Sequence, residues 1–469
     1  MVWKFNDEQP IYQQIISQIK ERIVAGEWKA GDKLKSVREL ALEAGVNPNT
    51  MQKALAELER EGLVYSQRTA GRFVSDNKEK TDRLQEEMTM ELTQVKHEIE
   101  TLAEKYRDEF EAVSAYIFAH PELAYHEMLA QDQLCGLLEK HGFKVQRGAG
   151  SLETAFVAEY RSGKPGMTFA FMCEYDALPE IGHACGHNLI GTSGAGAGVI
   201  LKEIMERYGI GGTLKVLGTP AEENGSGKIT MLDEGIFDGV DMALIMHPSD
   251  MSMADDISFA AVNKTYTFTG KPAHTAACPW MGASALNGVL QMFHAVDSQR
   301  LHFKDYTRVH GIILEGGTVV NIVPEKAVCR FNIRALDAGY LEEVIAVIDR
   351  CAKGAAICAG VEVEIKQDGY LIKDVRNNRE LVTAVEKNMD LIGEHHIPRD
   401  LTQGIGSTDV GNVTQALPAA QFYIGVGEGL GTHTAAFADA AGGEAGRRAL
   451  TAAVKVLAMT GLDMMSGRS

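Results

Sequence analysis

The 469-residue sequence has few cysteines and no long hydrophobic run. Its seven cysteines are an odd and scattered set, which argues against a disulfide framework and favours a reducing compartment. No run of about 18 apolar residues occurs, so we expect no membrane-spanning helix. The first residues also lack the basic and then apolar pattern of a secretion signal. We therefore expect a cytoplasmic protein.

Positive charge is also scarce, because the net charge is −18 at pH 7. Such an excess of acidic residues would by itself argue against nucleic-acid binding. Residues 1–76, however, hold eleven Lys and Arg against eleven Asp and Glu, so the acidic excess lies downstream of them. A neutral N-terminal part can still bind DNA through a local basic face.

The N-terminal part has the pattern of three helices followed by a hairpin. Apolar residues recur at helical spacing over 11–23. Ser36 with Glu39 three residues later is a capping box for a second helix. Asn47, followed by proline, caps a third helix that a glycine ends. Residues 63–74 then have the pattern of a hairpin with a polar tip.

Residues 77–105 are highly charged and contain neither glycine nor proline. From Leu84 to Tyr106, apolar side chains recur at steps of three and four residues, which is close to a heptad seam of about three repeats. Two interpretations remain open at this point. The segment is either a short coiled coil or a single amphipathic helix packed on a neighbouring domain.

From about residue 106 onwards, apolar strands alternate with helices, which predicts an α/β sheet. Between 257 and 371 the pattern changes to hairpin, helix, hairpin, helix and strand, as in an α+β domain. We therefore predict an α/β catalytic domain formed by 106–256 and 372–469, with a domain inserted at 257–371. The helical segment 77–105 links it to the N-terminal domain, 1–76.

Candidate metal ligands follow several of the predicted strands. They are Cys185, His187, Glu223, His247 and His433. Because ligands favour the carboxyl edge of parallel sheets, these side chains are expected to converge there. Each signal is weak alone, since a pair such as Glu222-Glu223 is often only a solvated turn. Four elements that end in Cys, His or Glu within one sheet favour a metal site.

These residues lie in motifs of a known family. The motifs are Glu174-Tyr-Asp-Ala-Leu-Pro, Gly182-His-Ala-Cys-Gly-His-Asn, Pro220-Ala-Glu-Glu, Lys271-Pro-Ala-His-Thr, Gly317-Thr-Val-Val-Asn-Ile-Val-Pro, Gly406-Ser-Thr-Asp-Val and Thr432-His-Thr. In this order they resemble the dinuclear-metal aminoacylase and dipeptidase family, over about 110–469. The resemblance is greatest to its aminobenzoyl-glutamate hydrolase and amino-acid-conjugate hydrolase branch.

The resemblance implies two divalent metal ions, Zn²⁺ or Mn²⁺. The implied ligands are Cys185, His187, Glu223, His247 and His433, with Cys185 bridging. Glu222 is implied as the general base for water, and Asp176 as the carboxylate that orients a ligand histidine. Glu174 stands where other branches have a ligand histidine and has no assigned role, and His183 is interpreted as a loop residue.

The resemblance also implies a homodimer, because a histidine such as His274 reaches the catalytic site of the partner subunit to stabilise the oxyanion. Asn321 and Arg334 are implied as the pair that binds the substrate's carboxylate, Arg334 in a bidentate manner. For Arg334 the alternative is an ordinary charge on the surface of a strand.

The N-terminal part resembles a GntR-type winged helix-turn-helix over about 9–75. The resemblance rests on Pro10-Ile-Tyr-Gln-Gln-Ile, Gly31-Asp-Lys-Leu-Lys-Ser-Val-Arg-Glu-Leu-Ala, Val46-Asn-Pro-Asn-Thr, Glu59-Arg-Glu-Gly-Leu-Val and Gly71-Arg-Phe-Val. One departure is Lys35, where proline is usual. The candidate contacts to double-stranded DNA are Ser36, Arg38, Asn47, Asn49, Thr50, Gln52, Lys53, Arg68 and Arg72. The alternative is that these polar residues are only a solvated surface.

Together these features predict a metal-dependent hydrolase fused to a DNA-binding transcription-regulator domain. Its substrate would be the amide bond of an N-acyl amino acid, an aminobenzoyl-glutamate-like conjugate or a dipeptide. Two alternatives remain. In one, the hydrolase-like part is a ligand sensor without catalysis, and in the other the winged helix serves only for dimerisation or is a relic that binds no DNA.

Overall fold

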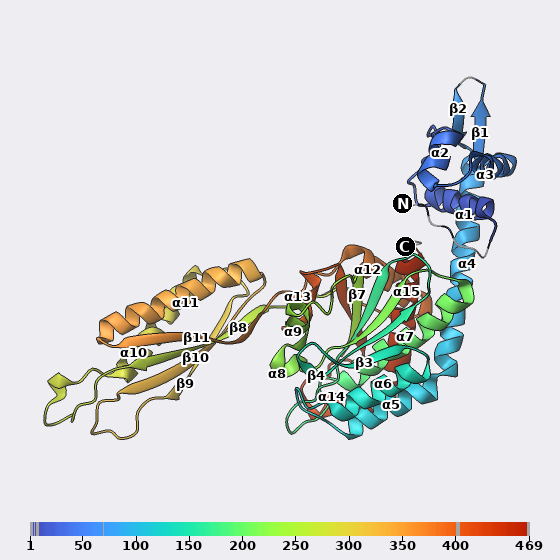
Figure 1. Cartoon of the computed structure of the whole chain (residues 1–469). Helices are drawn as coiled ribbons and strands as arrows, with labels where there is room; N and C mark the ends of the chain where they lie inside the picture. Colours follow the sequence, from blue (N-terminus) through green and yellow to red (C-terminus); the bar gives the residue numbers. More distant parts are fainter. Residues whose placement is uncertain (1–2, 4, 6–8, 69, 400–403, 467–469) are drawn as a thin grey trace.

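The computed structural model describes residues 3, 5, 9–68, 70–399 and 404–466. Figure 1 shows three units in a row: the N-terminal unit at the top right, a central α/β unit, and an inserted unit at the left. The long helix α4 (Lys78–Lys105) runs from the N-terminal unit along the side of the central unit. The predicted α/β class with a helical N-terminal domain is confirmed.

The N-terminal unit forms as its capping signals predict. Its elements are α1 (Ile11–Val24), α2 (Val37–Ala44), α3 (Pro48–Glu61), β1 (Val64–Gln67) and β2 (Gly71–Val74). The predicted capping box is confirmed, because Glu39 N donates to Ser36 Oγ and Ser36 N donates to the Glu39 carboxylate. Asn47 caps α3 by accepting a hydrogen bond from Asn49 N at 2.8 Å. The helix ends at Gly62, whose φ of 76° suits glycine.

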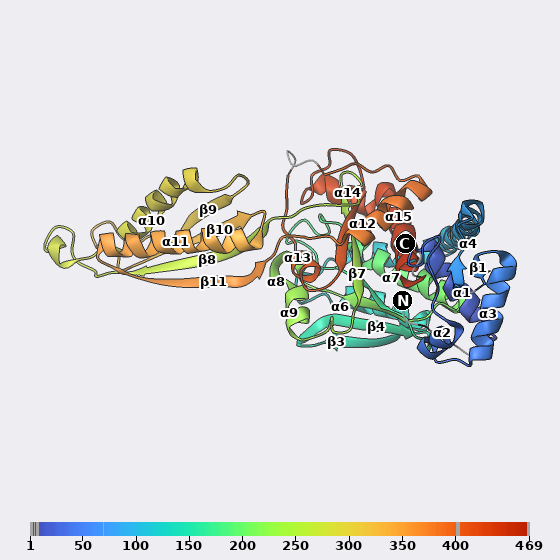
Figure 2. The ribbon, with the colours of Figure 1, turned by 90° about the horizontal axis from the view of Figure 1, so that it is seen from above.

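The apolar side of α4 is divided between two domains. Leu84 is buried in the core of the N-terminal unit, whereas Ile99 and Leu102 are buried in the core of the central unit. The buried Lys96 Nζ also donates to Asn388 Oδ1 and to the Asp463 carboxylate, each at 2.8 Å. Within one chain, α4 is therefore an amphipathic helix that packs on both domains, the second of the two interpretations. Figure 2 shows it beside the central unit from above.

The central unit is built on a six-stranded sheet with the order β12-β7-β5-β6-β4-β3. Its strands are β3 (Lys144–Ala149), β4 (Leu152–Arg161), β5 (Thr168–Cys173), β6 (Thr213–Gly218), β7 (Met242–Ser249) and β12 (Ala419–Gly425). Strands β12, β7, β5 and β6 are parallel, whereas β4 and β3 pair antiparallel at one side. The carboxyl ends of the four parallel strands therefore share one edge of the sheet.

Helices cover both faces of this sheet. They are α5 (Arg107–Ala119), α6 (Met128–Lys140), α7 (His187–Tyr208), α8 (Glu222–Gly225), α9 (Gly227–Asp233), α12 (Arg379–Ile392), α13 (Val410–Thr414), α14 (Ala435–Gly442) and α15 (Glu444–Ser466). Helix α7 lies close to β5, because a Cβ at Gly194 would come within 2.6 Å of Cys173 Sγ. This close packing fixes the start of α7, where His187 lies, beside the carboxyl end of β5.

One helix among the described residues, α15, is long and apolar enough to cross a membrane by length and composition. Its most apolar window is 78% buried inside the structure, where α15 packs on α7. The hydrophobicity of α15 is therefore accounted for by its place in the core of the central unit.

The inserted unit leaves the central unit through β8 and returns through β11. Its elements are β8 (Ala260–Thr269), η1 (Pro279–Met281), α10 (Ala285–Gln299), η2 (Arg300–His302), β9 (Arg308–Glu315), β10 (Lys326–Ala335), α11 (Ala338–Ala359) and β11 (Glu362–Ile372). The antiparallel sheet has the order β11-β8-β10-β9, and Tyr266, Phe268 and Phe331 lie in the core between it and the helices. Strand β9 is an open edge of this sheet.

Candidate metal centre

The candidate metal ligands gather at the carboxyl edge of the parallel strands. Strand β5 leads to Asp176, β6 to Glu223, β7 carries His247 near its end, and β12 precedes the loop with His433. His187 begins α7. Elements far apart in the sequence therefore meet at one place, as parallel strand ends predict.

Asp176 is the buried centre of this arrangement. Its Oδ1 lies 3.0 Å from His187 Nδ1, and its Oδ2 accepts a hydrogen bond from Glu223 N at 3.0 Å. Burial raises the pKa of Asp176, but the charge and hydrogen bond of His187 outweigh burial, so this pKa is lowered overall. With Nδ1 facing the carboxylate, the other nitrogen of His187 points into the site, where it has no hydrogen-bond partner among the described residues.

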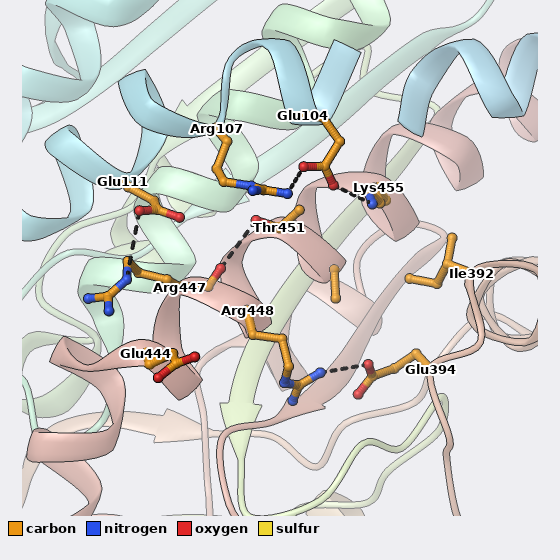
Figure 3. A pocket seen from close by; sticks show the side chains of 11 residues that line it. Glu104, Arg107, Glu111, Ile392, Glu394, Glu444, Arg447, Arg448, Thr451 and Lys455 are labelled. Atoms are coloured by element: carbon orange, nitrogen blue, oxygen red, sulfur yellow. Dashed lines mark hydrogen bonds and ion pairs between the residues drawn. The ribbon is translucent and has the colours of Figure 1, made fainter. Parts of the chain in front are cut away.

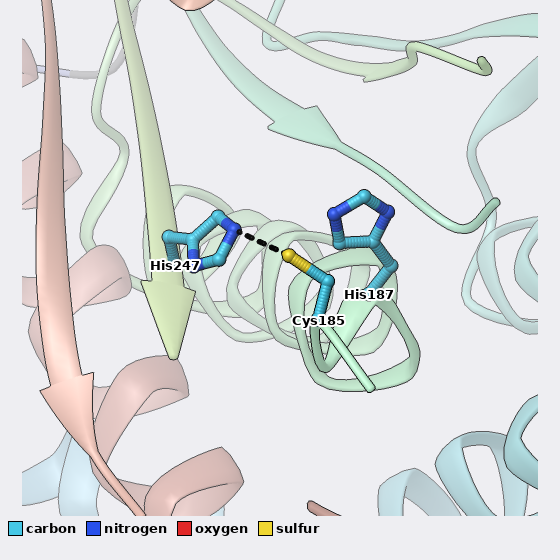
Figure 4. Close-up of side chains that lie close together, drawn as sticks. All are labelled: Cys185, His187 and His247. Carbon is cyan, nitrogen blue, oxygen red and sulfur yellow. Dashed lines mark hydrogen bonds between the residues drawn. The ribbon is translucent and has the colours of Figure 1, made fainter. Parts of the chain in front are cut away.

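Cys185 and His247 face each other across the site, as Figure 4 shows. Cys185 Sγ lies 3.5 Å from His247 Nε2, and His247 Nδ1 lies 2.7 Å from the Pro248 carbonyl oxygen. The carbonyl can only accept, so Nδ1 carries the proton and Nε2 keeps its lone pair for a metal. Burial raises the pKa of the Cys185 thiol, so a bound cation is needed to make it the thiolate that ligates metal.

Two sets of three potential ligands share Cys185. One set is Cys185, His187 and His247, and the other is Cys185, Glu223 and His433. Within each set the ligand atoms lie within 4.8 Å of one another. The buried Glu223 Oε1 has no hydrogen-bond partner among the described residues, although His433 Nε2 lies 3.3 Å from it. Sulfur, imidazole and carboxylate donors suit zinc and related divalent ions, so the donors of each set fit such an ion.

Glu222 belongs to neither of these two sets, but with His187 and Glu223 it forms a third group whose ligand atoms lie within 4.8 Å of one another. It follows Ala221, a residue held at a φ of 60° that a non-glycine residue rarely adopts. The backbone N–H of Ala221 is fixed by the buried Glu127, whose Oε1 accepts it at 2.9 Å. Burial, together with the charges of Glu174 and Asp409, raises the pKa of Glu222 well above its ordinary value. A carboxylate with a raised pKa is suited to accept a proton near neutral pH.

A cavity of about 550 Å³ opens from these residues toward the inserted unit. Arg334 of β10 lines it, with Nε donating to Asn332 Oδ1 at 2.8 Å and one terminal nitrogen donating to Ser407 Oγ at 3.3 Å. Burial lowers the pKa of the guanidinium, but an arginine side chain stays charged in proteins. Arg334 is therefore a cation that faces the cavity rather than a charge on an open strand surface.

His274 and Asn321 are not among the residues that line this cavity. They are neighbours at the far end of the inserted unit, where Thr275 N donates to the Asn321 carbonyl oxygen and His274 pairs with Ile322. Residues 264–269 of β8 separate this end from the cavity, which the first residues of the strand line, a span of roughly 20 Å at 3.4 Å per residue. Within one chain the structure therefore does not bring Asn321 together with Arg334, nor His274 to the metal ligands.

Sequence reasoning assigned no role to three buried charges beside the site. Lys228 Nζ lies 2.6 Å from Glu174 Oε1 and 2.7 Å from Asp409 Oδ1, and all three side chains are buried. Asp409 lies in a motif that supported the family resemblance, but its position alone did not indicate a function. The pairing joins residues far apart in the chain, so no local spacing could reveal it.

A second cavity, drawn in Figure 3, lies between α4, α5 and α15, away from the metal ligands. Its charged side chains pair with one another, as Lys455 does with Glu104 at 3.0 Å and Arg448 with Glu394 at 2.8 Å. It is smaller than the cavity at the metal ligands, about 420 Å³. The first pair joins α15 to α4, and the second joins α15 to the loop after α12.

The candidate DNA contacts lie on α2, α3 and the hairpin of the N-terminal unit. The exposed ones are Ser36, Arg38, Asn47, Asn49, Gln52, Lys53 and Arg68, and the partly buried ones are Thr50 and Arg72. Five of them make contacts within the domain. Ser36 and Asn47 cap α2 and α3, Lys53 Nζ lies 3.6 Å from the centre of the Tyr12 ring, and Arg72 donates to Gln52 Oε1 at 3.4 Å. Most of the set therefore faces solvent, and Asn49, Gln52 and Lys53 do so on α3, the helix that enters the major groove in helix-turn-helix domains.

The fold and the site together define a metal-dependent hydrolase of the α/β class, joined through α4 to a winged helix-turn-helix domain. Comparison with known families identifies both parts. Residues 11–74 match the bacterial regulatory proteins of the gntR family, and residues 170–456 match peptidase family M20/M25/M40.

Known proteins similar to this chain include a dipeptidase and a hydrolase. The Xaa-Arg dipeptidase of Mus musculus is 35% identical over 76% of this chain and 85% of its own length. One of the subunits of the p-aminobenzoyl-glutamate hydrolase of Escherichia coli is 34% identical over 58% of this chain and 60% of its own length.

Solved structures share the fold of the central and inserted units. A dinuclear metal binding peptidase of the M20 family from Bacillus subtilis has a TM-score of 0.63 at 20% identity, over 77% of this chain and 99% of that one. The aminobenzoyl-glutamate utilization protein of Klebsiella pneumoniae has a TM-score of 0.61 at 18% identity, over 78% and 98%.

The chain belongs to peptidase family M20/M25/M40 and carries a gntR-family DNA-binding domain before it. It is a metal-dependent amide hydrolase of that family. Both resemblances drawn from the sequence are thereby confirmed.

Proposed function

We propose that this protein hydrolyses the amide bond of an N-acyl amino acid, an aminobenzoyl-glutamate-like conjugate or a dipeptide, with two divalent ions. The two ligand sets that share Cys185, with Glu222 beside them, carry this proposal. Arg334 in the adjoining cavity supports a substrate with a free carboxylate. The dipeptidase and aminobenzoyl-glutamate hydrolase among the similar proteins support the same substrate class.

The residues of the chain have distinct tasks in this reaction. When bound, the two ions, Zn²⁺ or Mn²⁺, polarise the scissile carbonyl and make water a stronger acid. Glu222 accepts the proton of the attacking water and passes it to the leaving nitrogen. Asp176 holds His187 in the tautomer that ligates metal. Arg334 binds the carboxylate of the amino-acid part of the substrate and so fixes the scissile bond over the site.

Substitution of the base tests the reaction. Glu222→Gln removes the proton acceptor but keeps the size of the side chain, so metal content should stay at the wild-type level. Amide hydrolysis across a panel of the three substrate types should fall by about 10²- to 10⁴-fold. Glu428→Gln, in an exposed loop, is the control and should behave as wild type. Wild-type turnover by a metal-loaded Glu222→Gln protein would refute the role of Glu222.

We further propose that the protein is a homodimer in which His274 of one subunit completes the catalytic site of the other. Two observations support this. His274 lies too far from the metal ligands of its own chain, and the open edge strand β9 exposes apolar side chains at Ile312, Ile313 and Leu314. An unpaired edge with exposed apolar residues is a typical protein interface. Pairing of the β9 strands of two copies would cover these apolar side chains.

A mixing experiment tests the dimer directly. His274→Ala and Glu222→Gln proteins should each be inactive, whereas a mixture after subunit exchange should regain up to about a quarter of wild-type activity. Recovery follows because a mixed dimer holds one site with both residues intact. Absence of recovery in a mixture that light scattering shows to be dimeric would contradict the shared site.

We also propose that the N-terminal unit binds double-stranded DNA in the cytoplasm and makes the chain a transcription regulator. The exposed polar side chains at the start of α3 and Arg38 on α2 support this. Binding to the DNA upstream of the chain's own gene should weaken steeply with salt. A salt-insensitive signal, equal on random duplexes, would argue against a regulator. Sequence-specific binding without any amide hydrolysis would favour the sensor alternative.

A further inference from the structure

The buried charges beside the metal ligands form a connected group of three residues. Lys228, the second residue of α9, has no exposed surface, and its Nζ lies between Glu174 Oε1 at 2.6 Å and Asp409 Oδ1 at 2.7 Å. Asp409 also accepts a hydrogen bond from the backbone N–H of Lys228 at 3.0 Å. Asp409 therefore holds residue 228 by both its backbone and its side chain.

Glu174 connects this group to the metal centre. While its Oε1 faces Lys228, its Oε2 lies 3.5 Å from His187 Nε2, the nitrogen that points into the site. Oε2 is buried and has no hydrogen-bond partner among the described residues. A buried carboxylate oxygen without a donor is costly unless a cation lies near it. A metal ion on His187 Nε2 would be that cation.

The charged form of Lys228 is stabilised by the carboxylates that surround it. Burial by itself lowers the pKa of a lysine, but the carboxylates of Asp409, Glu174 and Glu222 more than offset burial, so the pKa of Lys228 is raised. Lys228 is thus a permanent cation among three carboxylates. Such a residue both neutralises their repulsion and fixes the orientation of the one that it contacts most closely.

We propose that Lys228, Glu174 and Asp409 form a positioning triad, in which Lys228 anchors Glu174 so that its free oxygen stabilises the ion held by His187 and His247. Glu174 supplies negative charge close to this ion, and Asp409 fixes the anchor. The triad lies outside the two ligand sets described above. The inference rests on the proposed two-ion centre but not on the identity of the substrate.

Metal-binding isotherms of the full-length protein with Zn²⁺ and with Mn²⁺ test the triad. Glu174→Gln keeps the size of the side chain and removes its charge, so binding of one of the two ions should weaken by about 10- to 100-fold. Lys228→Met should weaken the same step, and Lys228→Arg, which keeps a cation, should restore it in part. The control is Lys264→Met, because Lys264 is also buried and paired, with Asp349 at 2.7 Å, but lies in the inserted unit.

The double variant separates positioning from a general structural effect. If Lys228 acts through Glu174, Lys228→Met should add little to the loss of metal affinity in a Glu174→Gln protein, because the effects of substituting coupled residues are not additive. With Co²⁺ as the probe, the charge-transfer band of the Cys185 thiolate should persist in both single variants, which shows that the ligand sets remain intact.

Several results would overturn the triad. Wild-type metal affinity in Glu174→Gln would do so. Tighter metal binding in Lys228→Met would also do so, because it would mean that the lysine acts only as a cation that repels the ion. Additive losses would make Lys228 an independent structural residue. Thermal unfolding would show whether each variant folds. If Glu174→Gln or Lys228→Met does not fold, the same isotherms are measured on Glu174→Asp or Lys228→Arg instead. Two-ion binding that depends on Glu174 in a protein inactive on every amide would refute the proposed function and leave the triad standing.

Discussion

The substitution Asp176→Asn probes how the protein orients His187. Asp176 accepts from both His187 Nδ1 and Glu223 N, each at 3.0 Å, and it is almost completely buried. An asparagine offers only one oxygen, so its NH₂ group must face one of these two donors. One charge-assisted hydrogen bond is lost, which costs about 1.5–3 kcal/mol. This converts to roughly a 10- to 150-fold loss of metal affinity if the cost falls on the metal-bound state.

Calorimetric titration of the metal-free protein with Zn²⁺ measures this loss. The matched control is Asp241→Asn, because Asp241 accepts a backbone hydrogen bond from Thr168 at 2.7 Å at the opposite end of β5. The control should bind metal as wild type does. If Asp176→Asn bound both ions with wild-type affinity, the orientation of His187 by Asp176 would be refuted.

Three further predictions concern stability and DNA binding. Burial lowers the pKa of His183 to about 4, so the unfolded state binds more protons between about pH 6.5 and 4, and stability is lost as pH falls through this window. Urea unfolding of the metal-free protein should show a smaller loss from pH 7 to 5 in His183→Gln, and an equal loss would contradict burial of a neutral histidine. Lys96→Met leaves Asp463 buried without its cation and should destabilise the protein by about 3–5 kcal/mol in urea unfolding; a change below 1 kcal/mol would mean that this pair does not hold α4. Arg38→Ala should weaken operator binding and reduce the salt slope by about one, as gel shifts at several salt concentrations would show; an unchanged slope would remove Arg38 from the phosphate contacts.

The sequence was most informative where a residue's role follows from its place at a strand end. Glu223 and His247 lie shortly after a strand or near the end of one, in strands that the apolar runs predict, and parallel strands bring these ends together. Capping signals predicted the N-terminal domain equally well, since Ser36 and Asn47 act through neighbours two or three residues away. Local interactions of this kind can be predicted from the sequence alone.

Contacts between distant residues could not be predicted in this way. Lys228 and Asp409 pair across 181 positions, and nothing in their surroundings in the sequence indicates it. The seam of α4 left two interpretations open, because a heptad pattern states which side of a helix is apolar but not what covers it. The family resemblance named Asn321 and Arg334 as a pair, but Asn321 precedes β10 and Arg334 lies near its other end, so one chain does not bring the two together.

Crystals of the metal-loaded protein, measured at the absorption edge of zinc, test the two-ion centre most directly. Anomalous scattering should show two peaks, one among Cys185, His187 and His247 and one among Cys185, Glu223 and His433, with Cys185 Sγ about 2.3 Å from each. A single peak, or two peaks of which neither contacts Cys185, would contradict the proposed metal centre.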